Sequence, residues 1–249
     1  MKKIIIIGAG AMGSAFAVPC VDNKNDVTIV GTHLENDLIE KIKSNDQIHP
    51  ALKTKLSNDI QFEKFEKLQT ILDQDLDIIV CGVSSIGIEW FVQQISKKYK
   101  KRLPIILLTK GLSILDNELT TLSDKIRTLL SKDGHSEINI SAIKGPCLAA
   151  GLANKMRTGT IIANQKVKEA QLLKGIISTN YYSTEISEDI NGVELSGAIK
   201  NIYSMLIGAS EGLSNSKAPK EIQSKFFLNT AASLIHRSIS EMVEFVSHY

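Results

Sequence analysis

Cysteine is scarce in this chain, and so are aromatic residues and net charge. The three cysteines, Cys20, Cys81 and Cys147, form no CxxC pair, which argues against disulfides and metal sites and favours reduced cytoplasmic thiols. Lys and Arg number 29 against 27 Asp and Glu, so the net charge is only +2. We therefore expect neither nucleic acid nor an anionic membrane as a partner.

Long hydrophobic runs are also rare. Residues 4–21 carry no charge and follow two lysines, as in a secretory signal peptide. Their glycines, Gly8, Gly10 and Gly13, instead have the spacing of a strand that enters a tight turn and then a helix. The other apolar runs are too short to span a bilayer, so we expect no transmembrane segment.

Short β-branched runs recur in the first part of the chain, with helical stretches between them. This alternation predicts an α/β fold, a doubly wound Rossmann-type parallel sheet covered by helices on both faces. We assign residues 1–187 to this dinucleotide-binding domain, with residues 45–67 as a long loop or a small excursion. The expected strands are residues 3–7, 27–30, 77–80, 105–108, 138–142 and 160–163, and the expected helices include residues 86–99, 116–130 and 167–177.

After residue 187 the pattern becomes purely helical. Residues 191–213 and 221–249 have helical periodicity and are rich in Ala, Ser, Ile and Leu. We therefore expect residues 188–249 to form part of an all-helical substrate domain. The last helix keeps an apolar stripe without a Gly or Pro stop signal, and we expect a further segment or a second copy in a homo-oligomer to cover it. The stripe consists of Ile235, Ile239, Met242 and Val246.

The most informative local motif is the glycine-rich segment after the first expected strand. Residues 8–13, GAGAMG, match G-x-G-x-x-G directly after the run IIII and open a helix. In a dinucleotide site, Gly8 permits the tight turn and Gly10 lets the backbone approach a pyrophosphate. Gly13 lets the helix pack on the strand. We expect NAD or NADP as the cofactor.

The second expected strand bears on the choice between these cofactors. It is followed by Gly31-Thr32-His33 and lacks the acid that normally binds the ribose 2′-hydroxyl of NAD. Thr32 and His33 offer a hydroxyl and an imidazole instead, so we expect NADP to be accepted and slightly favoured. Glu35 is still close enough along the chain to reach a ribose.

Two further segments follow expected strands at the edge where open α/β sheets bind ligands. Ser84 follows the third strand, and Lys110 follows the fourth in the sequence Thr109-Lys110-Gly111. An ammonium at Lys110 would bind a substrate phosphate or polarise a carbonyl group. A solvated lysine at a strand end is the alternative.

A second lysine lies on a helix face of small residues. Helical spacing brings Lys200 onto one face with Val193, Gly197, Ser204 and Gly208. Such a face allows close approach of the cofactor domain, and a desolvated lysine with a lowered pKa could exchange a proton during hydride transfer. Helix packing through small residues, with Lys200 reaching solvent, is the alternative.

Together these motifs resemble NAD(P)-dependent glycerol-3-phosphate dehydrogenase. The resemblance implies the reversible reduction of dihydroxyacetone phosphate to glycerol 3-phosphate by NAD(P)H, a step in phospholipid precursor synthesis. It covers essentially the whole chain. The shared segments, in the family's order, are GAGAMG at 8–13, TKGL at 109–112, GPCLA at 145–149 and GVELSGAIKN at 192–201.

The resemblance also implies roles for individual residues. Lys200 would be the catalytic proton donor and acceptor, with Asn201 beside it, and Lys110 would contact both substrate and cofactor. Gly145 and Cys147 would lie near the substrate. The implied cofactor contacts are Gly8, Gly10, Ala11, Met12, Gly13, Thr32, His33, Ser84, Lys110 and Ala149.

The chain departs from the family pattern in three places. Cys147 stands where the family usually has Ser, and Gly151 stands where it has Glu. The family's Gly-Asp-Leu and Arg-Asn segments, which complete the carbonyl site and grip the phosphate, do not occur in these residues. We therefore expect cofactor binding with at most a trace of turnover. A related hydroxyacid or opine dehydrogenase and a nucleotide-binding fragment without turnover remain alternatives.

Overall fold

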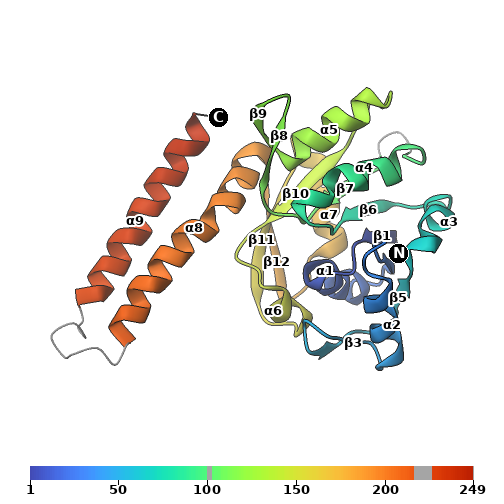
Figure 1. Ribbon diagram of the computed structural model, residues 1–249, viewed down its shortest axis with the longest axis horizontal. Helices are drawn as coiled ribbons and strands as arrows, with labels where there is room; N and C mark the ends of the chain where they lie inside the picture. Colours follow the sequence, from blue (N-terminus) through green and yellow to red (C-terminus); the bar gives the residue numbers. More distant parts are fainter. Residues whose placement is uncertain (100–102, 216–225, 249) are drawn as a thin grey trace.

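The computed structural model describes residues 1–99, 103–215 and 226–248 (Figure 1). Its centre is an eight-stranded sheet with the order β12-β11-β10-β7-β6-β1-β2-β5. The strands of this sheet are β1 (Lys3–Ile7), β2 (Asp26–Val30), β5 (Ile60–Glu63), β6 (Ile78–Cys81), β7 (Ile105–Leu107), β10 (Ile140–Lys144), β11 (Thr158–Ala163) and β12 (Tyr182–Ser187).

Helices cover both faces of the sheet, and two longer helices extend away from it (Figure 1). The covering helices are α1 (Ala11–Asp22), α2 (Asn36–Ser44), α3 (Leu68–Leu72), α4 (Ile88–Ser96), α5 (Leu122–Lys132), α6 (Ala149–Ala153) and α7 (Val167–Ile177). The extending pair is α8 (Ile190–Asn215) and α9 (Phe226–Ser247). This is the expected Rossmann-type architecture with a helical C-terminal part.

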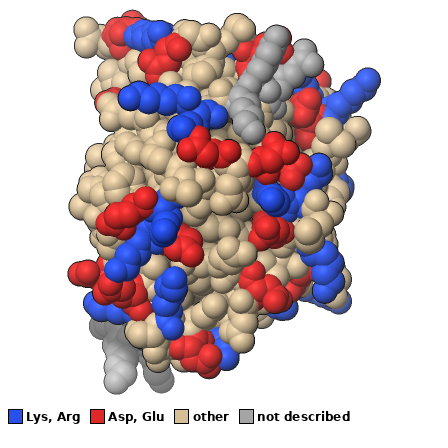
Figure 2. All heavy atoms as spheres, turned by 90° about the vertical axis from the view of Figure 1, so that its right-hand side faces the viewer, with Lys and Arg blue, Asp and Glu red and all other residues tan. Residues whose placement is uncertain are grey.

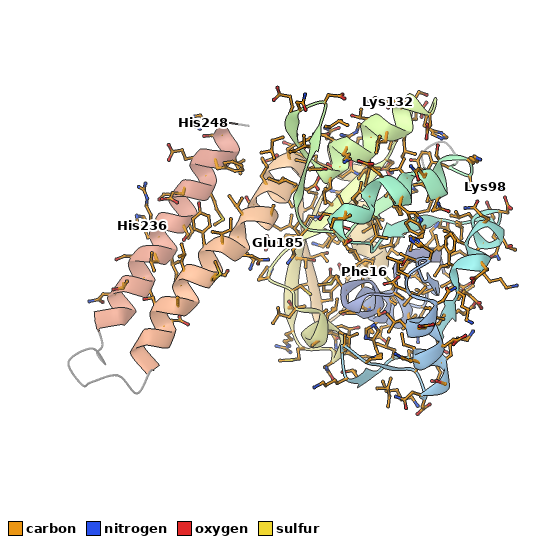
Figure 3. The ribbon with its side chains drawn as sticks, viewed as in Figure 1. Phe16, Lys98, Lys132, Glu185, His236 and His248 are labelled. Atoms are coloured by element: carbon orange, nitrogen blue, oxygen red, sulfur yellow. The ribbon has the colours of Figure 1, made fainter. Side chains whose placement is uncertain are left out.

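The central strand β1 explains why the sheet is buried on both sides. Its side chains from Ile4 to Ile7 are at most 2% exposed, because alternate residues point into two separate cores. On one side Phe16 of α1, labelled in Figure 3, lies in the core. Its ring packs edge-on against that of Tyr182, with ring centroids 6.3 Å apart.

The strand order reverses beside β1, which pairs in parallel with β2 on one side and β6 on the other. Loops at the carboxyl ends of these strands diverge there and leave a crevice, the usual ligand position in open α/β sheets. The glycine-rich segment between β1 and α1 lies at this crevice, so the strand order and the sequence motif indicate the same ligand-binding segment.

The sheet is not parallel throughout, which corrects the expectation for its far edge. β11 runs antiparallel to β10, and β12, which was not anticipated, runs parallel to β11. The connection from β10 to β11 contains only the five-residue helix α6. That helix is too short for a crossover that returns the chain to the same end of the sheet, so the strand direction reverses.

The helix expected at residues 116–130 begins later than predicted. Residues before it form a hairpin of β8 (Leu112–Leu115) and β9 (Glu118–Thr121), and α5 starts at Leu122. The hairpin turn consists of Asp116 and Asn117, both with positive φ, a conformation that these residue types tolerate well. The Oγ1 of Thr121 then accepts a hydrogen bond from the Asp124 amide and caps the helix.

Residues 45–67 are more regular than the expected loop. They contain the small hairpin of β3 (Ile48–His49) and β4 (Thr54–Lys55), the edge strand β5 and the short helix η1 (Phe65–Lys67). β5 pairs with β2, so this segment extends the sheet.

α8 leaves the end of β12 and packs its first turns against β10, β11 and the β8–β9 hairpin. α9 lies alongside α8 (Figure 1). Residues 221–225 of the expected last helix lie outside the described residues. Within the described residues, no helix combines the length and apolarity that a membrane span requires.

The surface charge is mixed. On the face shown in Figure 2, basic and acidic side chains lie next to one another and do not gather by sign. Several charged side chains form ion pairs, for example Lys98 with Asp73 and Lys2 with Asp77.

Candidate active site

The glycine-rich turn has the geometry of a dinucleotide-binding loop. Gly8 has φ +111°, and a Cβ atom there would lie 2.8 Å from the carbonyl carbon of Gly82. A Cβ on Gly13 would lie 2.4 Å from the Gly8 carbonyl oxygen, so the helix approaches the end of the strand this closely only because residue 13 is glycine. A Cβ on Gly10 would meet only the Glu35 Oε1, at 3.8 Å, so the space above Gly10 is open.

The N-terminus of α1 faces this open space. Gly10 is the N-cap, and no side chain caps the helix. The first amides of a helix lack partners inside it and favour an anion. A pyrophosphate would therefore fit here, with the amides of Ala11, Met12 and Gly13 as donors. The roles of Gly8, Gly10 and Gly13 as cofactor contacts stay predictions.

The peptide unit at Ala9 is held from three sides. Its N–H donates to Glu35 Oε2 at 3.0 Å, and the same oxygen accepts the Thr32 amide at 2.8 Å. Its carbonyl oxygen accepts from Ser14 Oγ and lies 3.0 Å from His49 Nε2. The turn is thus fixed by Glu35 and His49, neither of which belongs to the glycine motif.

His49 reaches the turn from the β3–β4 excursion and is 1% exposed. Its Nδ1 accepts hydrogen bonds from the amides of Ala51 and Leu52, so the ring proton lies on Nε2 and is directed at Ala9. The excursion therefore supports the cofactor loop, a function that its sequence did not indicate.

Thr32 and His33 follow β2, at the side of the crevice where a ribose would lie. His33 is exposed and lies in an aromatic cluster with Phe65 and Trp90, at centroid distances of 6.0 and 5.4 Å. Trp90 is the single tryptophan of the chain. A ligand that contacts His33 should therefore alter its fluorescence.

Lys110 lies at the end of β7, half-buried, with its Nζ 3.5 Å from the Gly145 carbonyl oxygen. Burial, and then the positive charge of Lys200, lower the pKa of its ammonium group. Gly145 cannot be replaced without movement, because a Cβ there would lie 2.8 Å from the Thr160 Cα.

Lys110, Gly145 and Lys200 line one cavity of about 600 Å³ between the sheet edge, α8 and α9. Such a volume suits a small ligand and part of a cofactor. The cavity also contains Val193 and Gly197 from the small-residue face of α8. The further part of that face is different: Ser204 and Gly208 are exposed, and no atom lies within 4 Å of a Cβ added to Gly208.

Other expected site residues lie apart from this cavity. Asn201 is exposed and is not among its lining residues, since it follows Lys200 and points from a different side of α8. Cys147 is 6% exposed and lines a separate small cavity with Met12 and Lys110. Ser84 is exposed after β6, and Ala149 is half-buried at the start of α6.

Lys144 and Glu194 are buried charged residues near the site that sequence reasoning missed. Lys144, the last residue of β10, is 3% exposed and donates hydrogen bonds to the carbonyl oxygens of Leu107 and Thr109. Glu194 of α8 is fully buried, and its Oε2 accepts the Ser123 amide. Burial raises the pKa of the Glu194 carboxyl group. The sequence did contain an indication of both residues, because each is a charged residue within a segment of otherwise apolar or small residues.

Comparisons with known proteins identify the family of this chain. The family profile described as "NAD-dependent glycerol-3-phosphate dehydrogenase N-terminus" matches residues 3–170, and the corresponding C-terminal profile matches residues 189–249. An NADP(+)-dependent glycerol-3-phosphate dehydrogenase of Archaeoglobus fulgidus is 33% identical over 98% of this chain and 69% of its own length. A glycerol-3-phosphate dehydrogenase [NAD(P)+] of Mesoplasma florum is 28% identical over 100% of the chain and 69% of its own length.

Solved structures show the same fold. Glycerol-3-phosphate dehydrogenase from Coxiella burnetii superposes with a TM-score of 0.79 at 22% identity, over 99% of this chain and 69% of that one. The enzyme from Plasmodium falciparum superposes with a TM-score of 0.78 over 98% of this chain and 65% of that one. Because both family profiles match and one relative is 33% identical, the chain belongs to the NAD-dependent glycerol-3-phosphate dehydrogenase family.

Proposed function

We propose that this chain carries out hydride transfer between NAD(P)H and dihydroxyacetone phosphate, with glycerol 3-phosphate as the product. The observation that supports this most directly is the shared cavity of Lys110, Gly145 and Lys200, with Lys110 at a strand end and Lys200 on α8. The open space above Gly10 accommodates a dinucleotide pyrophosphate. In this proposal residues 1–187 hold the cofactor and residues 188–249 supply one wall of the substrate site.

The cofactor supplies the hydride when it is bound. Lys200 then donates a proton to the carbonyl oxygen as the carbonyl carbon is reduced, and it accepts that proton in the reverse reaction. Lys110 holds a positive charge near the same oxygen and the phosphate, and its partial burial strengthens that interaction. The Gly145 carbonyl oxygen, 3.5 Å from Lys110 Nζ, restricts where that ammonium points.

The choice of cofactor belongs to the same proposal. The end of β2 carries no acid, and Thr32 and His33 remain available to a 2′-phosphate. The Glu35 carboxylate approaches from the following loop, but its Oε2 is engaged with two backbone amides. We expect NADPH to bind at least as tightly as NADH.

The test is steady-state oxidation of NADPH and NADH with dihydroxyacetone phosphate, pyruvate or no substrate. We expect oxidation above the background only with dihydroxyacetone phosphate. Equal rates with pyruvate would instead indicate a hydroxyacid dehydrogenase. Cofactor binding without any turnover would indicate a nucleotide-binding protein.

A homo-oligomer is also proposed, on the basis of α9. Ile239, Met242, Val243 and Val246 line the open cavity, and Ile235, Ile239 and Val243 remain 45%, 54% and 66% exposed. Apolar residues exposed along one helix favour association. Sedimentation of the wild-type chain and of Ile239→Glu tests this, with a smaller assembly expected for the variant. A wild-type monomer would contradict it.

We propose a cytoplasmic location as well, which the cysteines support. Cys20, Cys81 and Cys147 are buried and free, as a reducing compartment maintains them. Cell fractionation would test this.

A further inference from the structure

Lys144 is a buried cation for which the proposed reaction has no use. It ends β10, is 3% exposed, and directs its Nζ at two carbonyl oxygens, that of Thr109 at 2.7 Å and that of Leu107 at 3.2 Å. A buried ammonium is tolerated only with such partners. Both acceptors lie at the end of the neighbouring strand β7, so Lys144 connects two strand ends by its side chain.

Lys144 is linked to the site through the residues that follow Thr109 and Lys144 in the chain. Thr109 precedes Lys110, whose own Nζ lies 3.5 Å from the carbonyl oxygen of Gly145, the residue after Lys144. Lys144 therefore donates to the carbonyl oxygen of the residue before Lys110, and the Lys110 Nζ lies near the carbonyl oxygen of the residue after Lys144. The direction in which Lys110 leaves the sheet therefore depends on the Lys144 contact with Thr109.

The aliphatic part of Lys144 also contacts α8. A Cβ atom on Gly197 would lie 3.2–3.3 Å from the Cβ, Cγ and Cδ atoms of Lys144, closer than ordinary van der Waals contact. Gly197 lies one helical turn before Lys200. Lys144 therefore determines how closely the helix that carries Lys200 approaches the sheet edge that carries Lys110.

The titratable groups around Lys144 come from three elements. Glu194 of α8 favours its ammonium form and Lys110 after β7 opposes it, while burial raises the pKa of the Cys81 thiol of β6 to about 12, so that thiol is uncharged. Burial is the largest influence and lowers the pKa of Lys144 to about 8. At neutral pH the ammonium form predominates, and all three of its N–H groups can donate.

We propose that Lys144 is a positioning residue, which holds Lys110 and the helix of Lys200 at the spacing that the phosphorylated substrate requires. The inference rests on the proposed function, because it assigns Lys110 and Lys200 to the substrate. Lys144 also lines this cavity, but its Nζ is turned to the carbonyl oxygens of Leu107 and Thr109, and in this proposal it does not bind the substrate. Its effect passes through the Thr109 carbonyl and the Gly197 contact.

The first test removes the ammonium and keeps a long side chain. In Lys144→Met we expect the KM for dihydroxyacetone phosphate to rise at least tenfold, while the Kd for NADPH stays within twofold. Amide hydrogen exchange in a peptide covering residues 107–112 should accelerate at least fivefold. The matched control is Lys125→Met, which removes another buried lysine that binds Ser113 and Glu89. It should lower stability without raising the KM.

A second pair of variants covers the case in which Lys144→Met does not fold. Gly197→Ala leaves Lys144 intact but crowds its stem, and Gly208→Ala adds the same methyl group where no atom lies within 4 Å. We expect the KM increase and the faster exchange for Gly197→Ala only. Unchanged KM and exchange in both Lys144→Met and Gly197→Ala would overturn the inference.

The exchange measurement does not depend on turnover. If the wild-type chain binds cofactor but reduces no substrate, the proposed function fails. Faster exchange at residues 107–112 in Lys144→Met would then still support the positioning role, and unchanged exchange would refute it.

Discussion

The Glu35 carboxylate accepts the Ala9 amide at 3.0 Å through Oε2, while its Oε1 lies 3.8 Å from the position of a Cβ on Gly10. One oxygen therefore organises the turn, and the other borders the space in which we expect the cofactor. Glu35 follows the end of β2 in the sequence, and the fold places its carboxylate against the glycine-rich turn at Ala9.

This arrangement predicts the effect of Glu35→Gln. The amide oxygen of Gln can still accept the backbone hydrogen bonds, but the negative charge that opposes a 2′-phosphate is lost. We expect the ratio of NADPH to NADH affinity to increase about tenfold, ~1.4 kcal/mol. Titration followed by Trp90 fluorescence measures both affinities. Asp37→Asn, an exposed change on the same helix, is the control and should leave the ratio unchanged.

Substitutions at two glycines of the turn should affect different properties, the free energy of unfolding for Gly13 and the cofactor affinity for Gly10. Gly13→Ala forces a methyl group to 2.4 Å from the Gly8 carbonyl oxygen, and we expect a loss of about 1–3 kcal/mol in the free energy of unfolding. Gly10→Ala meets only Glu35 Oε1 at 3.8 Å, so stability should change little while cofactor affinity falls at least tenfold. Urea unfolding and cofactor titration measure the two effects. Normal cofactor affinity in Gly10→Ala would contradict the assigned pyrophosphate position.

In a chain extended by a complete C-terminal domain, Lys200→Ala should lower kcat by roughly 10² to 10⁴, the usual contribution of a general acid. Cofactor affinity should barely change, because Lys200 lies on α8 and not in the glycine-rich turn. Single-turnover oxidation of NADPH with dihydroxyacetone phosphate is the measurement. A kcat within a factor of three of the wild-type value would show that Lys200 is a packing residue.

Lys144 should make stability depend on pH at the alkaline end. Its pKa in the folded chain is about 8, below the ordinary lysine value, so between these values the unfolded chain binds more protons than the folded one. Stability therefore rises with pH in this window. Relative to Lys144→Met, the wild-type chain should gain up to about 3 kcal/mol from about pH 8 to pH 10.5. Chemical unfolding at several pH values measures this, and a constant difference between the two proteins would refute it.

Local sequence determined the parts of this protein that depend on neighbouring residues. The run Ile4 to Ile7 followed by glycines at fixed offsets predicted a buried strand, a tight turn and a helix, since each residue's role there is decided within a few positions. The helical spacing around Lys200 likewise predicted that Val193, Gly197 and Lys200 share a face, and they line one cavity. The family motifs pointed to the same turn and strand ends.

Tertiary structure decided what depends on residues far apart in the chain. The reversal of β11 follows from a connection too short for a crossover, and β12 pairs only because β11 provides its partner. The contacts of Glu35 with Ala9 and of Lys144 with Gly197 join segments that no periodicity relates. The local sequence pattern predicts which face of a helix or strand is apolar. It does not predict which carbonyl oxygen accepts a hydrogen bond from a buried lysine. That is decided by packing, because a buried charge persists only where the assembled fold supplies its partners.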